Sequence, residues 1–79
     1  MKVRVRLYAS FRRYLGDLQA GTPVEIELPE GSTLRDLAQV LKLPVDEVKV
    51  CFINGIISEL DQPLHENEEV GMFPPIGGG

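Results

Sequence analysis

One segment of the sequence has the pattern of an amphipathic helix, and it limits the possible folds more than any other feature. Its apolar residues recur at i, i+3, i+4 and i+7, at Leu34, Leu37, Ala38 and Leu41. Thr33 can cap the first turn, to which Asp36 adds a favourable negative charge. Pro44 predicts that the chain leaves the helix by about Leu43. Because this helix has a single apolar stripe, we expect it to pack on a sheet.

The chain before this helix is typical of two β-strands. Residues 3–7 alternate apolar with basic side chains, and residues 24–28 alternate apolar with acidic ones. This period of two indicates strands with one face turned toward a core. Between them, Ser10 can cap a short helix over residues 11–15 that Gly16 would end.

The chain after the helix predicts three more strands. Residues 48–53 are mostly apolar, and Asn54-Gly55 is the favoured pair for a two-residue hairpin turn that returns through residues 56–57. A last strand at residues 70–73 follows a polar, acidic loop. Pro74 and Pro75 end it, since proline has no amide hydrogen to donate to a ladder.

The predicted order is therefore strand, strand, helix, strand, strand, strand. This order favours an α+β roll, with one mixed sheet of about five strands and one main helix packed on one face. We expect residues 1–75 to form the domain and residues 76–79 to form a flexible C-terminal tail.

Composition narrows the class of function. With 43% hydrophobic and 25% charged residues in 79, the chain is typical of one small folded domain. Its net charge of −4 disfavours nucleic acid and anionic membranes as partners and favours a basic protein surface. A single cysteine allows no internal disulfide or zinc site, and no apolar run approaches the length of a membrane span, so we expect a cytoplasmic protein. His65, flanked by acidic residues, is interpreted as part of a solvated turn.

Two interpretations remain for the third predicted strand. Val48, Val50 and Phe52 share one face of it by alternation, and Cys51 and Ile53 share the other. We favour Cys51 and Ile53 under the helix. Phe52 is then exposed and forms a patch for partners with the aromatic residue at position 73. In the alternative, Phe52 is simply core. Cys51 is interpreted as a small buried hydrophobe with no chemical role.

The C-terminal sequence FPPIGGG is the main functional signal. A terminal carboxylate is an anion at neutral pH and can attack the α-phosphorus of a nucleotide to give a mixed anhydride with AMP. A sulfur nucleophile can then displace AMP and leave a thiocarboxylate. Glycine at positions 78 and 79 leaves the reacting carbon unshielded and lets the backbone lie against active-site walls. Terminal glycines alone usually mark a loose end, but the apolar FPPI segment before them favours a function.

The β-grasp arrangement together with this tail resembles the MoaD/ThiS sulfur carriers, the ubiquitin-like proteins of molybdopterin and thiamine synthesis. The small subunit of molybdopterin synthase in this family typically has Phe-Pro-Pro ahead of a terminal Gly-Gly. The matching residues are Phe73, Pro74, Pro75, Gly78 and Gly79. Gly77 stands where the family often has a larger residue, a departure that adds flexibility and leaves the diglycine in place.

The resemblance implies a sulfur-carrying co-substrate and no catalytic activity of its own. Gly79 would be the site of adenylation and of the thiocarboxylate, and Gly77 and Gly78 would thread into the partner's active site. The implied partners are an E1-like adenylating enzyme (MoeB/ThiF-like), a sulfurtransferase and a large molybdopterin synthase subunit (MoaE-like). ATP and Mg would be used by the adenylating partner, with no cofactor bound stably by this chain. The residues expected to contact partners are Phe52, Phe73, Pro74, Pro75 and Ile76.

Two other functions stay open at this point. The activated tail could form a bond to lysine, as in ubiquitin-like modifiers, or pass sulfur to thiamine, an amino acid or tRNA. Alternatively, the chain is a non-reactive β-grasp interaction domain whose tail is a docking peptide. The last alternative predicts that replacing Gly79 leaves function unchanged.

Overall fold

The computed structural model describes residues 1–8, 11, 23–48 and 50–74. In chain order the elements are β1 (Lys2–Leu7), β2 (Val24–Glu27), α1 (Leu34–Val40), the 3-10 turn η2 (Val45–Glu47), β3 (Val50–Ile53), β4 (Ile56–Ser58) and β5 (Glu69–Phe73). Of the short helix predicted at residues 11–15, only Phe11 is described; it is buried in the core. The rest of that prediction lies outside the described residues.

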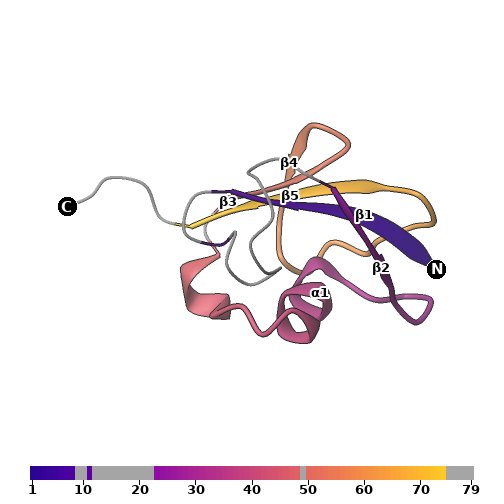
Figure 1. Cartoon of the computed structure of the whole chain (residues 1–79), viewed down its shortest axis with the longest axis horizontal. Coiled ribbons are helices and arrows are strands. Elements are labelled where there is room, and N and C mark those ends of the chain that lie inside the picture. The colour runs from indigo at the N-terminus through magenta and orange to yellow at the C-terminus, as the bar shows by residue number, and fades with distance from the viewer. Residues whose placement is uncertain (9–10, 12–22, 49, 75–79) are drawn as a thin grey trace.

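The strands form one mixed sheet in the order β2-β1-β5-β3-β4. The middle strand, β5, runs parallel to β1 and antiparallel to β3, and the two outer pairs are antiparallel. Helix α1 crosses one face of this sheet, and the other face carries no helix among the described residues (Figure 1). The predicted α+β roll, a mixed five-stranded sheet with one main helix on one face, is confirmed.

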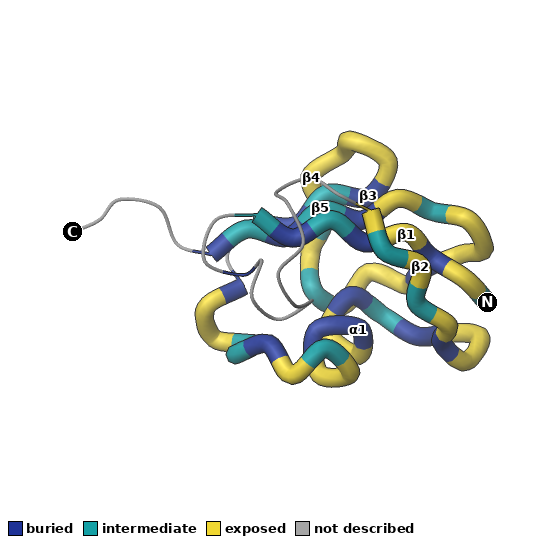
Figure 2. The backbone as a smooth tube through the Cα atoms, viewed as in Figure 1, coloured by how far each residue is buried: buried dark blue, intermediate teal, exposed yellow. Residues whose placement is uncertain are grey.

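The core lies between α1 and the sheet. Strand alternation turns Val3, Val5 and Leu7 of β1 and Met72 of β5 toward the helix, and each is at most 2% exposed. The helix contributes its predicted apolar stripe: Leu34, Leu37 and Ala38 are fully buried, and Leu41 is partly buried against them. Figure 2 shows this buried layer in dark blue on both elements, with the outer surface of α1 exposed.

The start of α1 follows the sequence prediction. The Thr33 hydroxyl accepts a hydrogen bond from the Asp36 amide at 3.2 Å, and the Asp36 carboxylate accepts one from the Thr33 amide at 2.9 Å. These two bonds form a capping box, which satisfies two amides that the first helical turn would otherwise leave free.

The helix ends earlier than Pro44 suggested. Val40 is its last residue, and Lys42 takes a left-handed conformation with φ of 61°. The Leu43 amide then donates to the Ala38 carbonyl at 2.9 Å, which closes the helix end. Pro44 therefore follows a helix that has already stopped.

The predicted hairpin is present, but the strand before it is shorter than expected. Asn54 and Gly55 both have positive φ, 51° and 82°, as a two-residue turn that matches strand twist requires. Strand β3 begins at Val50 because η2 precedes it and is closed by a hydrogen bond from the Val48 amide to the Val45 carbonyl. Val48 is thus outside the strand and buried, so the prediction that it shares a face with Phe52 is wrong.

Candidate functional site

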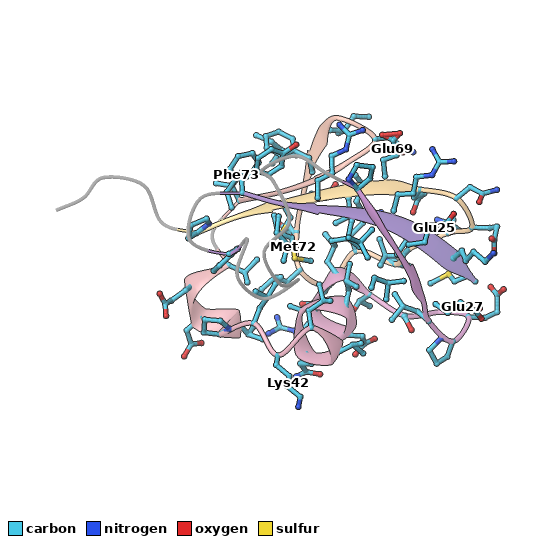
Figure 3. The ribbon with its side chains drawn as sticks, in the orientation of Figure 1. Glu25, Glu27, Lys42, Glu69, Met72 and Phe73 are labelled. Carbon is cyan, nitrogen blue, oxygen red and sulfur yellow. The ribbon has the colours of Figure 1, made fainter. Side chains whose placement is uncertain are left out.

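The face of the sheet opposite α1, here called the open face, brings together side chains from four strands. Arg6 of β1, Gly71 of β5, Phe52 of β3 and Ile57 of β4 are successive partners in the ladder. Side chains paired in this way lie on the same face. In Figure 3, Phe73 and Glu69 of β5 lie on the side away from α1, whereas Met72 points toward the helix.

Three aromatic rings gather on the open face at the end of β5. The rings of Tyr8 and Phe73 are stacked, with centroids 4.3 Å apart and planes 1° apart. Phe52 meets Phe73 edge-on at 5.8 Å. Both geometries are favourable for aromatic pairs. These three residues are called the aromatic cluster.

The cluster confirms the favoured orientation of β3, and the role of Phe52 and Phe73 as a patch for partners stays a prediction. Cys51 and Ile53 are buried under the helix, whereas Phe52 lies on the open face beside Phe73. Phe52 is half-buried rather than fully exposed, because its ring packs against Phe73. Tyr8 was missed by the sequence analysis. Its signal was available, since position 8 continues the alternation that places residues 4 and 6 on the open face.

Gly71 has no side chain, and a hollow of about 280 Å³ lies above it. The rings of the aromatic cluster form part of its wall, and Arg6 and Glu69 lie at its charged side. This depression is called the Gly71 hollow. No sequence signal marked it, because a glycine within a predicted strand does not show which side chains surround it.

The charges beside the hollow form a weak network. Glu69 lies 4.0 Å from an Arg4 nitrogen and 3.9 Å from an Arg6 nitrogen, and all three side chains are about half exposed. Exposed pairs at such distances add little stability. Within the described residues, the Arg6 Nε is buried and has no hydrogen-bond acceptor, so Arg6 keeps a donor unused next to the hollow.

The root of the C-terminal tail adjoins the aromatic cluster. Phe73 is the last residue of β5 and pairs with Val50, and the Tyr8 amide donates to the Met72 carbonyl at 3.3 Å. Pro74 follows the strand and is buried, although a contact with partners was expected of it. The remaining predicted tail residues, Pro75, Ile76, Gly77, Gly78 and Gly79, lie outside the described residues.

Cys51 lies on the other face of the sheet and has no access to the hollow. Burial raises the pKa of its thiol from 9.0 to about 11, because the charged thiolate would lose its hydration. The thiol therefore stays protonated at neutral pH, in agreement with its interpretation as a small buried hydrophobe.

Neither a metal site nor a membrane span is found in the described part of the chain. His65 lies on an exposed turn, where its Nδ1 is 3.6 Å from a Glu68 carboxylate oxygen. Residues 1–8, 11, 23–48 and 50–74 include no group of three or more His, Cys, Asp or Glu placed to hold a metal ion. Over the same residues, no helix has the length and apolar character to cross a membrane.

The family comparison covers both the sheet and the tail. The model of the ThiS family matches residues 5–79. The chain belongs to the ThiS family. This membership confirms the resemblance to the MoaD/ThiS group and places the chain among small ubiquitin-like sulfur carriers rather than catalysts. The comparison with curated proteins found no match.

The following solved structures are similar to this ThiS-family chain over all or nearly all of its length. A candidate molybdopterin converting factor subunit 1 from Pyrococcus furiosus is 33% identical, with 96% of this chain and 99% of that chain covered and a TM-score of 0.72. The complex of subunits 1 and 2 of the molybdopterin-converting factor from Helicobacter pylori contains a chain that is 19% identical, with full coverage of both chains and a TM-score of 0.60. Caldiarchaeum subterraneum ubiquitin is 16% identical, with 100% and 98% covered and a TM-score of 0.59. The last two likenesses show a common fold, and the ubiquitin match confirms the β-grasp.

Proposed function

We propose that this ThiS-family protein carries sulfur as a thiocarboxylate on Gly79 and donates it in molybdopterin synthesis. The observation that carries the proposal is the 33% identity, over 96% of this chain, to the candidate molybdopterin converting factor subunit 1. The FPPIGGG terminus supports it, since the tail supplies the Phe-Pro-Pro and the diglycine that the resemblance requires.

The proposed chemistry needs two displacements at the terminal residue. A carboxylate oxygen of Gly79 attacks the α-phosphorus of ATP, and pyrophosphate leaves with the electrons of the broken P–O bond. Sulfide then attacks the acyl carbon, and AMP leaves. The product is a thiocarboxylate whose sulfur can attack an electrophilic carbon of a pterin precursor. Glycine suits this position because it has no Cβ to shield the acyl carbon.

The fold can hold the root of the tail in a fixed place. Strand β5 is paired on both sides, with β1 and with β3, and it ends at Phe73. The Tyr8 ring stacked on Phe73 adds a further constraint at this end. An extended segment over residues 76–79 reaches roughly 13 to 14 Å, enough to enter a buried active site. A partner that binds the open face could therefore receive Gly79 at a set distance from its contact surface.

The proposal assigns the remaining chemistry to partners. An E1-like adenylating enzyme would use ATP and Mg, and a large synthase subunit would hold the pterin. The complex of subunits 1 and 2 from Helicobacter pylori supports a MoaE-like partner for a protein of this fold. We place the reaction in the cytoplasm, where ATP is available.

Intact mass spectrometry tests the proposal. The protein with its native terminus is incubated with ATP, Mg, sulfide and the adenylating enzyme of the same genome, next to a variant that lacks Gly79. We expect a mass gain equal to the exchange of one oxygen for sulfur, and no gain in the variant. If the full chain shows neither this gain nor an AMP adduct, the carrier function is wrong and the docking-peptide alternative is favoured.

A second candidate function is transfer of the activated tail to other acceptors. The fold shared with ubiquitin and the match to the ThiS family support this second candidate function. Incubation of the thiocarboxylated protein with cell extract separates the two functions. Conjugates joined through Gly79 to lysine would favour a modifier, and sulfur transfer to thiamine precursors or tRNA would favour another carrier route. Sulfur transfer to a pterin in the presence of the large subunit would favour the first proposal.

A further inference from the structure

Gly71 lies at the centre of the sheet, where glycine is an unfavourable residue. It is the middle residue of β5, which is itself the middle strand, and its partners are Arg6 and Phe52. Glycine weakens a strand interior, because it loses more backbone entropy on folding and offers no side chain for packing. Such a position needs an explanation in the backbone, in the packing or in the function.

The backbone gives no such explanation. Gly31 and Gly55 have φ of 85° and 82°, values that residues with a side chain rarely adopt. Gly71 has ordinary strand dihedrals outside this positive-φ region. Packing gives none either. A Cβ built on Gly71 would lie 3.4 Å from Cε2 of Tyr8 and 4.0 Å from Cε1 of Phe73, which are ordinary van der Waals contacts. Alanine would therefore fit in the free protein.

Because glycine has no side chain, the Gly71 hollow stays open at this position. We propose that the hollow receives one apolar side chain of the enzyme that activates the C-terminus, and that Gly71 is the residue that makes this contact possible. This inference rests on the proposed function. It assigns to the open face a specific contact point beyond the aromatic rings.

The position of the hollow favours a partner that receives Gly79 in its active site, as the activating enzyme does. Gly71 is two residues before Phe73, on the same face, and the segment after Pro75 extends only roughly 13 to 14 Å. An enzyme whose active site holds Gly79 must therefore lie close to the end of β5. Gly79 is six residues after Phe73, which lines the hollow.

The size and chemistry of the hollow favour a side chain as the occupant. At about 280 Å³, the hollow has room for one apolar side chain. Its aromatic wall continues across the sheet to Ile57, which is 72% exposed, so the surrounding surface is apolar. Arg6 and Glu69, on its charged side, can hydrogen-bond the backbone next to the inserted side chain.

The test compares Gly71→Ala with wild type in ATP–pyrophosphate exchange catalysed by the adenylating enzyme of the same genome. Overpacking a well-fitted contact typically weakens it by about tenfold or more. We therefore expect the KM for the carrier to rise about tenfold for Gly71→Ala. The kcat should stay unchanged, because the terminal glycine that reacts is intact. Ser58→Thr is the matched control: it also adds one methyl group to a strand, but at a position paired with Cys51, on the face opposite the hollow. Its KM should equal that of wild type.

Thermal unfolding shows whether Gly71→Ala is folded, and Phe52→Leu provides a second alteration of the hollow with the backbone unchanged. An unchanged KM for a folded Gly71→Ala variant, or a fall in kcat alone, overturns the inference and leaves the proposed function standing. If the wild-type protein supports no exchange, both the inference and the proposed function are wrong. The last measurement is the oligomeric state of the carrier alone, by sedimentation. If the wild type is a dimer and Gly71→Ala dissociates it, a second copy of this chain occupies the hollow, and the assignment to the enzyme is overturned.

Discussion

Cys51 is 3% exposed on the face of β3 that packs toward α1, and this burial determines how its thiol titrates. The unfolded chain loses the thiol proton near pH 9.0, whereas the folded protein keeps it until about pH 11. Between these pH values the unfolded state binds fewer protons, so the free energy of unfolding falls as the pH rises. The fall is at most about 1.4 kcal/mol per pH unit.

Urea unfolding at a series of pH values from 8 to about 11 measures this effect, with Cys51→Ala as the comparison. This range is chosen because a single group changes the pH dependence of the stability only within about a pH unit of its two pKa values. We expect the wild type to lose more stability with rising pH than the variant, in which the other groups titrate alike. Parallel curves for the two proteins would show that the thiolate is not disfavoured in the folded state. As a second check, a thiol reagent at pH 8 should label Cys51 only after the protein is denatured.

At the scale of one element, the capping box accounts for the start of α1. Thr33→Ala removes the hydroxyl that accepts the Asp36 amide, and loss of such a cap costs about 1 kcal/mol. For a domain of this size, we expect a fall in Tm of roughly 4–8 °C. Calorimetry measures it, with Thr33→Ser as the control, because serine keeps the hydroxyl and should remain close to wild type. If Thr33→Ala and Thr33→Ser unfold at the same temperature, the cap does not stabilise the helix.

At the scale of the whole molecule, we expect the hydrophobic core to be separable from the terminus that is proposed to react. The buried cluster of described residues extends from Val3 to Met72, and β5 ends before the glycines. Deletion of residues 76–79 should therefore leave the free energy of unfolding within about 0.5 kcal/mol of wild type. The same deletion should abolish adenylation. Chemical denaturation together with ATP–pyrophosphate exchange measures both properties on one preparation. A large loss of stability would show instead that the last four residues belong to the folded domain.

Sequence periodicity predicted the elements better than their ends. The strands and the main helix follow from alternation at periods of two and 3.6, because these patterns reflect which side chains each element can bury. The ends of α1 and β3 differed from the prediction. Each end depended on the conformation of one or two residues, Lys42 and the turn before Val50, for which several alternatives are sterically allowed.

The sequence by itself determined the order of the elements, since the local hydrophobic periods are properties of short segments, and it predicted the chemistry of the tail. Only the tertiary structure decided what surrounds the root of the tail. Tyr8 directly follows β1, and Phe52 and Phe73 lie in β3 and β5; they meet because β5 pairs between β1 and β3. The hollow above Gly71 arises from the same pairing. Register between strands sets which side chains become neighbours, and register is a long-range property that no short segment contains.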